Sequence, residues 1–394
     1  MRRSICRGLS VTAGVLVGAL AIAAHNPSDA ADTKELMLKA LGTDENIGPI
    51  VTEAFEQAAK DLTPEERELA LKCWKENVCE TGRGELTVAL ADGFGENVWR
   101  QVTHMEFVMQ ALSYPNVKKI IYTSARGDAT KAISDMRSLI AQGANIITMF
   151  PDAGEAMLPT AKEATEAGIQ VVPYISPPGG EPGKDFLALV AENLCELGNQ
   201  FVQFVAENAS GDQINVVELG GTPGNGLSAA WQKCAEEKIK ANTAMTLLGK
   251  ADTNWTQEGT FEAMSSFLAQ NPKIDAVLYE YADGFRGGVR AYEAANRPLD
   301  LILSLRTDEQ GLFCDWEKAS NPNFKIFFSA GGTFQVRIAL TAAMAKLRGD
   351  EIPAVVDVPF KMKQVQSGMC NTALPVEMPV SSLVDADMLA LMFK

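Results

Sequence analysis

The stretch Glu85–Arg100, ELTVALADGFGENVWR, reads as a strand, a turn and the start of a helix. Leu86–Ala91 is an almost unbroken apolar run of strand length, typical of a parallel strand covered by helices on both faces. The turn 92–95, DGFG, contains two glycines, which adopt backbone angles that other residues resist. Trp99 and Arg100 follow in the first turns of the helix. Open parallel sheets bind ligands beyond the carboxyl ends of their strands, so we predict that both side chains contact a ligand. The alternative is a core tryptophan beside a solvated arginine.

Beyond this stretch, apolar segments of strand length alternate with segments whose apolar residues recur at helical spacing. This alternation predicts an α/β fold in which each parallel sheet has helices on both faces. The Pro- and Gly-rich segment 176–183 interrupts it about halfway, and ten strands exceed one comfortable sheet. The predicted strands are Leu86–Ala91, Val117–Thr123, Asn145–Phe150, Gln170–Ile175, Ile214–Leu219, Met245–Leu248, Ile274–Tyr279, Leu299–Leu305, Phe324–Ser329 and one near Ala354–Pro359.

These strands divide into two predicted lobes joined by a hinge. The first lobe covers 85–185 and the second 186–330, and the chain returns to the first lobe over about 331–365. Residues 366–394 form a C-terminal tail. A chain that crosses several times between lobes forms a hinge of short segments, suited to closure over a ligand.

The composition limits the classes of partner. The chain has 394 residues and a formal net charge of −15, which argues against nucleic acid or an anionic membrane as partner. It contains no CxxC, HExxH or Cys/His cluster, so we expect neither a metal site nor a cofactor. The glycine turn 220–226 lacks the GxGxxG spacing of a dinucleotide loop.

The N-terminus carries the pattern of an export signal. Residues 1–30 combine early arginines, an apolar stretch over 9–24 and small residues before Ala30, so we predict a signal peptide cleaved near Ala30 and a periplasmic product. A retained membrane anchor is the alternative. Residues 31–83 then form a predicted helical extension, with a helix start at Thr63-Pro64.

Export changes the meaning of the cysteines. Removal of the signal peptide takes Cys6 and leaves six, an even number that permits three disulfides in any of 15 pairings. Cys73 and Cys79 are close enough in sequence for a local bridge. Buried free thiols are the alternative, above all for the other four.

Four stretches resemble the type I periplasmic solute-binding proteins of ABC importers, in the branch that binds ribose and galactofuranose. The resemblance covers about Glu85–Val365. It implies that the protein captures a small molecule between two closing lobes and delivers it to a permease, that it acts as a monomer, and that it contacts the membrane only through the permease. The four stretches are LTVALADGFGENVWR (86–100), DMRSLIAQGANIITMFP (135–151), EAGIQVVPYIS (166–176) and INVVELGGTPGNG (214–226).

The chain departs from this family where sugar-binding members carry polar residues. Tyr174-Ile175-Ser176 replaces an Asp-Arg pair, 227–230 lacks an arginine, Tyr281 stands at an asparagine, and Arg306 stands at an aspartate. We therefore predict a ligand with a ring or apolar face and an oxygen-rich end, rather than a plain pentose or hexose. The candidate ligand-binding residues are Phe94, Asn97, Trp99, Arg100, Asp152, Tyr174, Ser176, Asn225, Tyr281, Asp283, Arg306 and Gln335, the last at the family's hinge glutamine.

Some candidates have a structural alternative. Asp152 could cap a helix, Asn225 could only form a turn, and Arg306 could pair with Asp308. We predict that replacing Trp99 or Arg100 by alanine weakens binding and leaves the fold intact.

Two other classes of function remain open. Catalysis by a carboxylate pair is one, although His104, in a predicted helix, is the single histidine after residue 30 and gives a histidine triad little support. A sensory protein that presents its ligand-bound state to a receptor or sensor kinase is the other, with 31–83 as its docking surface.

Overall fold

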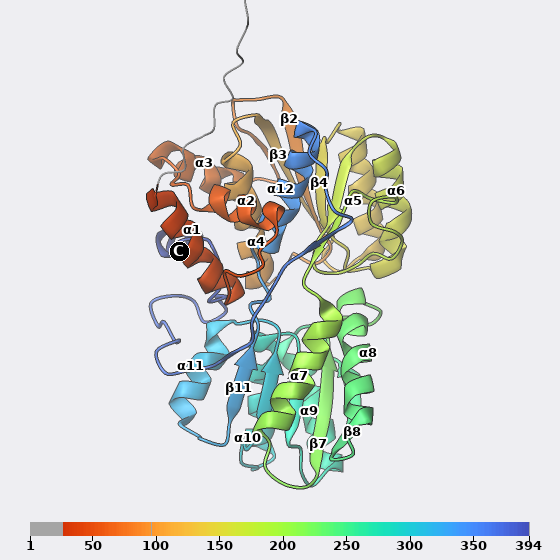
Figure 1. The fold of residues 1–394 in the computed structure, drawn as a ribbon, viewed down its shortest axis with the longest axis vertical. Coiled ribbons are helices and arrows are strands. Elements are labelled where there is room, and N and C mark those ends of the chain that lie inside the picture. The colour runs from red at the N-terminus through yellow and green to blue at the C-terminus, as the bar shows by residue number, and fades with distance from the viewer. Residues whose placement is uncertain (1–26, 96, 394) are drawn as a thin grey trace, which may run out of the picture.

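The computed structural model describes residues 27–95 and 97–393 and has two lobes, each built on its own sheet (Figure 1). This confirms the predicted α/β class with helices on both faces of largely parallel sheets. All ten predicted strands are present, each with one end or both ends shifted. The predicted signal peptide lies outside the described residues up to position 26, and α1 begins at Pro27, ahead of the predicted cleavage site at Ala30.

The first sheet has the order β1-β3-β2-β4-β5, and its strands are parallel except for β1. Alternate residues of β2 face opposite layers, as expected for a strand. Val88 and Leu90 pack with α4 and α12, whereas Ala89 and Ala91 pack with α5 and α6. The elements of this sheet and its layers are β1 Val78–Glu80, β2 Leu86–Asp92, α4 Val98–Leu112, β3 Val117–Ser124, α5 Ala129–Ala141, β4 Ile146–Phe150, the 3-10 helix η1 Gly154–Met157, α6 Leu158–Glu166, β5 Gln170–Pro173 and α12 Gln335–Arg348.

The second sheet has the order β13-β11-β10-β9-β7-β8, and β13 is antiparallel to β11. Helices α7 and α8 cover one face, and α9, α10 and α11 cover the other. Its elements are α7 Leu194–Asn208, β7 Ile214–Gly220, α8 Gly226–Ala241, β8 Met245–Asp252, α9 Gln257–Gln270, β9 Ala276–Tyr279, α10 Ala282–Ala294, β10 Ile302–Leu305, α11 Gln310–Ala319, β11 Lys325–Phe328 and β13 Lys363–Gln364.

Three short strands were not expected from the sequence. β1 belongs to the first sheet, although 31–83 was predicted to be a purely helical extension. β6 Leu189–Ala191 pairs with β12 Val355–Asp357 beside the first lobe. β13 lies inside the segment 331–365 that was expected to stay with the first lobe, yet it pairs with the second sheet. Strands of two or three residues carry too few side chains to show a periodic pattern.

The N-terminal extension packs on the first lobe. It contains α1 Pro27–Leu41, α2 Pro49–Ala58 and α3 Pro64–Lys75, and α2 contacts α12. Thr63 and Glu66 form a reciprocal capping box at the start of α3, as the Thr-Pro pattern indicated. The C-terminal tail ends in α13 Ala386–Met392, which packs on α3.

The structure joins all six cysteines beyond residue 30 in disulfides. Cys73 pairs with Cys79, which is the local bridge considered above. Cys195–Cys234 joins α7 to α8 within the second lobe, and Cys314–Cys370 joins α11 of that lobe to the C-terminal tail. No helix within 27–95 or 97–393 has both the length and the apolar character needed to cross a membrane.

Candidate ligand-binding site

A cavity lies between the lobes, at the carboxyl ends of strands from both sheets. It contains about 360 Å³ of empty space, including the part that opens to solvent. This is the place where open parallel sheets bind ligands. The wall is formed by Asn97, Trp99, Arg100 and Phe150 from the first lobe and by Leu227, Trp255, Glu280, Tyr281, Arg306 and Thr307 from the second.

The first-lobe wall is organised around the guanidinium of Arg100. Asn97 caps α4 by accepting a hydrogen bond from the Arg100 backbone N–H at 2.9 Å, which fixes the first turn of the helix. Arg100 is 3% exposed, and its Nη1 and Nη2 donate to Asp92 Oδ1 at 3.1 Å and to Asp152 Oδ1 at 2.8 Å. The guanidinium carbon lies 3.6 Å from the centroid of the Phe150 ring, a cation–π contact.

Burial and ion pairing act in opposite directions on these charges. Burial lowers the pKa of Arg100, but the attraction of Asp152 and Asp92 outweighs it, so the arginine stays charged. Burial also raises the pKa of Asp152 to about 7, against the opposing effect of Arg100. The guanidinium is therefore a fixed donor, and it forms ion pairs with carboxylates of its own lobe.

The second-lobe wall contains a carboxylate held by neutral donors. Glu280 accepts hydrogen bonds from Ser228 Oγ at 2.6 Å, Trp231 Nε1 at 2.5 Å and Trp255 Nε1 at 2.7 Å. Burial raises the pKa of Glu280, although these hydrogen bonds favour the ionised form. Because Trp255 is held at its Nε1, its ring is fixed at the edge of the cavity.

Arg306 connects the second-lobe wall to the hinge. It follows β10 directly, and its Nε donates to Glu192, which lies where the chain passes from β6 to α7. Gln335, the first residue of α12, donates from Nε2 to the other oxygen of Glu192 at 2.7 Å. Arg306 Nη2 is buried and has no hydrogen-bond partner among the described residues.

The structure brings together five of the predicted residues on the cavity wall: Asn97, Trp99, Arg100, Tyr281 and Arg306. Two more act behind the wall: Asp152 pairs with Arg100, and Gln335 reaches Arg306 through Glu192. Asp152 therefore forms an ion pair and is not a helix cap. The alternative pair between Arg306 and Asp308 is not formed, because Glu192 takes that position.

The other five candidates do not line the cavity. Phe94 lies half-buried in the turn after β2, and its carbonyl accepts from Ser124 Oγ at 3.2 Å. Tyr174 is buried behind Phe150, with ring centroids 5.4 Å apart. Asp283 accepts from Gln257 Nε2 at 3.1 Å.

Ser176 and Asn225 meet across the lobes. Ser176 Oγ donates to Asn225 Oδ1 at 3.3 Å, and the same oxygen accepts from the Leu227 backbone N–H at 2.8 Å. Asn225 is thus the N-cap of α8, close to the turn-forming role that was its alternative.

Several residues of the wall, and Glu192 behind it, were missed from the sequence. Phe150 ends a predicted strand and Glu280 follows one, so position alone could have singled out both. Trp255 lies in a connection with no motif, and Glu192 lies in a crossing segment, so neither carried a signal. Within the described chain, no three His, Cys, Asp or Glu side chains gather in a way that could hold a metal ion.

Comparison with known proteins points to one family. Residues 89–312 match the model of the periplasmic binding protein domain. The chain is 23% identical over 245 residues to a xylitol-binding protein of Mycolicibacterium smegmatis, which covers 62% of this chain and 68% of the relative. It is 24% identical over 247 residues to the ribose import binding protein of Bacillus subtilis, which covers 62% of this chain and 77% of the relative.

A solved structure with the same fold is the fructose-binding periplasmic domain of a hybrid two-component system. Its TM-score to this chain is 0.63 at 21% identity, and the match covers 72% of this chain and 91% of that domain.

Proposed function

Because the chain belongs to the periplasmic binding protein family, in the ribose-like branch of type I sugar-binding proteins, we propose that it captures a neutral, hydroxyl-rich ring compound between its lobes. The ligand is a sugar or a sugar-like molecule. The protein binds it without chemical change and delivers it to the permease of an ABC importer.

The observation that carries this proposal is the placement of matching groups from both lobes on one cavity. Trp99 and Arg100 face it from the first lobe, and Trp255, Tyr281 and Arg306 face it from the second. Aromatic faces pack against the apolar face of a ring, and guanidinium groups donate to its oxygens. Closure of the lobes brings the two sets together, so the ligand stabilises the closed form through contacts that exist only there.

The charges around the cavity favour a neutral ligand over an anion. Arg100 is paired with two carboxylates and Arg306 with one, and Glu280 adds a further carboxylate to the wall. An added anion would meet these buried carboxylates at low dielectric, where repulsion is strong. A hydroxyl group, in contrast, both donates to a carboxylate and accepts from a guanidinium.

The proposal that the ligand is delivered to an ABC importer is based on the proteins that this chain resembles. One of them is an import binding protein for ribose, and the family implies a periplasmic location. We propose export through residues 1–30, with cleavage near Ala30. The alternative output is signalling to a sensor kinase, since a periplasmic domain of a two-component system has the same fold and the extension α1–α3 offers a further surface.

A ligand screen tests the proposal. Thermal unfolding of the purified full chain would be followed with pentoses, hexoses, polyols, sugar acids and aromatic acids. A ligand at about 100 times its dissociation constant stabilises the fold by about 2.7 kcal/mol, a shift of some degrees. We expect neutral sugars or cyclic polyols to raise the melting temperature, and calorimetry to give one site. Stabilisation by acids only, or by no compound, would contradict the proposal.

A further inference from the structure

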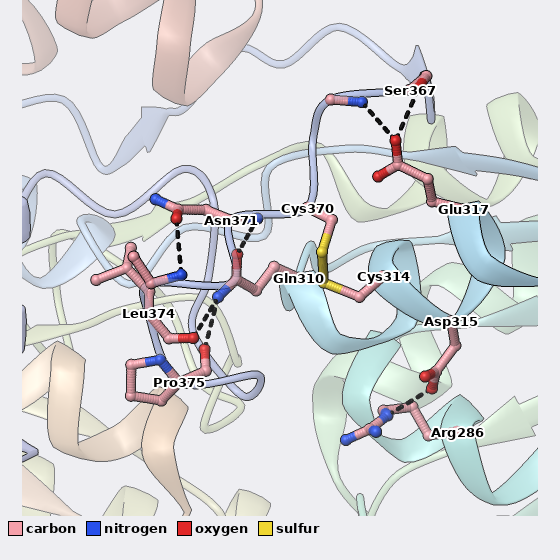
Figure 2. The surroundings of a disulfide bond; sticks show 12 residues. Arg286, Gln310, Cys314, Asp315, Glu317, Ser367, Cys370, Asn371, Leu374 and Pro375 are labelled. Atoms are coloured by element: carbon pink, nitrogen blue, oxygen red, sulfur yellow. Dashed lines mark hydrogen bonds and ion pairs between the residues drawn. A yellow bond between two sulfur atoms is a disulfide. The ribbon is translucent and has the colours of Figure 1, made fainter.

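The C-terminal tail is bonded to both lobes. We name residues 370–385 the C-terminal strap. At its start, Cys370 is joined to Cys314 of α11 in the second lobe (Figure 2). Gln310, the first residue of α11, accepts from the Asn371 backbone N–H at 2.9 Å and donates to the Pro375 carbonyl at 2.7 Å. This end of the strap is fixed to the second lobe.

Two adjacent serines in the strap bind opposite lobes. Ser381 donates from its backbone N–H and its Oγ to Asp308, which follows β10, at 2.9 and 3.1 Å. Ser382 Oγ donates to Glu106 of α4 in the first lobe at 2.9 Å. Both serines are 1% exposed. Consecutive Cα atoms lie about 3.8 Å apart, so the two attachment points cannot separate unless one set of bonds breaks.

The far end of the strap is fixed to the first lobe and its extension. Arg67 of α3 donates from both terminal nitrogens to the carboxylate of Asp385, at 2.6 and 2.9 Å. Lys39 of α1 donates to the Ser382 carbonyl at 2.6 Å. The helix that follows the strap, α13, packs on α3. The N-terminal extension therefore serves as the anchor of the strap.

The strap adds a fourth connection between lobes to the three that the described chain makes earlier. Those three run from β6 to α7, from β11 to α12 and from β12 to β13. Short crossing segments permit hinge motion. In the strap, adjacent side chains are bonded to opposite lobes at the crossing point, and each end is anchored by further bonds to one lobe.

We propose that the C-terminal strap restrains the separation of the lobes and thereby sets how much closed form the ligand-free protein contains. The affinity consequence rests on the proposed function: apparent affinity falls in proportion to the fraction of binding-competent protein. A strap that favours the closed form strengthens binding, and its release weakens binding and widens the range of opening.

A distance measurement tests the restraint without any ligand. Spin labels would be placed at Glu166→Cys on α6 and Lys233→Cys on α8, two exposed positions on different lobes. The double variant Ser381→Ala/Ser382→Ala removes both hydroxyl bonds and keeps the disulfide. We expect its distance distribution, by pulsed electron resonance, to become longer and broader than that of the parent.

A second pair of variants separates the strap from general destabilisation. Cys314→Ser/Cys370→Ser frees the base of the strap, and Cys195→Ser/Cys234→Ser removes a disulfide between α7 and α8 of the same lobe. We expect the first to widen the distribution and the second to leave it unchanged. If the first variant fails to fold, the serine variant decides. A serine variant with the parent distribution, or equal widening in the α7–α8 control, would overturn the proposal.

Affinity gives the consequence for binding. With a ligand from the screen, we expect the serine variant to bind about fivefold more weakly per lost hydrogen bond, mainly through faster dissociation. Widened distances with unchanged affinity would overturn the link to binding and leave the restraint standing. A protein with no ligand would refute the proposed function, whereas the distance result would still decide on the strap.

Discussion

The two walls of the cavity hold their arginines in different ways. In the first lobe, Arg100 forms ion pairs with Asp92 and Asp152, and both carboxylates lie at the ends of strands in the same sheet. In the second lobe, Arg306 is paired with Glu192, which belongs to a crossing between lobes and is shared with Gln335 of another crossing. One wall is complete within its own lobe, and the other depends on the hinge.

This difference indicates a division of roles. A buried charge is stable only while its partners stay in place. We propose that the Arg100 cluster, whose partners all belong to the first lobe, keeps them whether the lobes are open or closed and so presents a preformed binding face. We propose that Arg306, whose position follows the crossings, couples binding to closure. Variants of the first-lobe wall should therefore lose mainly stability, and variants of the second-lobe wall should lose mainly affinity for the ligand.

The largest effect, on the free energy of unfolding, is expected at the first-lobe wall. Arg100→Ala leaves the carboxylates of Asp92 and Asp152 buried without their cation, so the free energy of unfolding should fall by about 3–5 kcal/mol. The ion pairs thus change the expectation from sequence that this variant leaves the fold intact. Urea unfolding measures the loss. Arg306→Ala is the matched control, because Glu192 keeps Gln335, and an equal loss in both would remove the contrast between the walls.

The next effect is a pH dependence of stability that arises in the second lobe, between about pH 4.5 and pH 8. Glu218 of β7 is fully buried, neither carboxylate oxygen has a hydrogen-bond partner in the described chain, and burial raises its pKa to about 8. The folded state therefore holds this proton above the usual pKa near 4.5. Its contribution to stability is complete below that value and is lost as pH rises through about 8, by at most about 1.4 kcal/mol per pH unit. We expect Glu218→Gln to flatten this limb in urea unfolding; an unchanged slope would contradict it.

The first lobe should respond to acid instead. His104 of α4 is buried and stacked on Tyr122 with ring centroids 3.8 Å apart, and burial lowers its pKa to about 3. The folded state keeps the ring neutral, so its contribution is complete above about pH 6.5 and is lost as pH falls toward 3. We expect His104→Gln to flatten the loss of unfolding free energy that occurs as pH falls below about 6.5 and to leave the loss that occurs as pH rises toward about 8 as it is. If both variants altered the same limb, the assignment of the limbs to lobes would be wrong.

The sequence revealed the first wall better than the second, for a physical reason. The strand, turn and helix of the first wall are contiguous, so an apolar run followed by glycines places Trp99 and Arg100 at the end of a strand. The second wall is assembled from separate segments. Trp255 is fixed by Glu280, which is in turn held by Ser228 and Trp231 from α8, and no local pattern encodes these hydrogen bonds.

The contrast between contiguous and separate segments also explains which strands and which contacts of the tail could be predicted from the sequence. Long apolar runs such as β2 and β7 bury both faces and are visible in sequence. β13 has two residues, and its partner β11 ends more than 30 positions earlier, so only the tertiary structure defines it. The strap is irregular, and its anchors are single side chains such as Asp308 and Glu106, whose pairing is nonlocal. The pairing of four of the six cysteines likewise required the fold.

A smaller effect, on affinity for the ligand, is expected at the second-lobe wall. Arg306→Gln removes the buried Nη2 that has no partner in the described chain and the contact with Glu192, while Gln335 still bonds that carboxylate. A charge-assisted hydrogen bond is worth about 1.5–3 kcal/mol, so calorimetry should show at least about tenfold weaker ligand binding. Its loss of stability should be smaller than that of Arg100→Ala. Unchanged affinity would show that Arg306 belongs to the hinge alone.

The smallest effect compares the two tryptophans. Trp255→Phe keeps an aromatic ring but removes the donor to Glu280 Oε1, so this carboxylate retains only Ser228 and Trp231. A hydrogen bond to a charged group is worth about 1.5–3 kcal/mol, and only part of that reaches the ligand, so we expect affinity to fall by about fivefold. Loss of a donor also raises the pKa of Glu280 further, which should make the loss grow as pH falls.

Trp99→Phe is the control for that measurement. The ring of Trp99 packs edge-on to Phe150 with centroids 6.1 Å apart and lies 5.3 Å from the Arg100 guanidinium carbon, so its contacts come from the ring, and phenylalanine preserves most of them. We expect a loss of affinity of less than about threefold that does not depend on pH. If Trp99→Phe cost as much as Trp255→Phe with the same pH dependence, the second-lobe wall would be no more dependent on its hydrogen-bond network than the first. The division between a preformed wall and a coupled wall would then rest on the arginines alone.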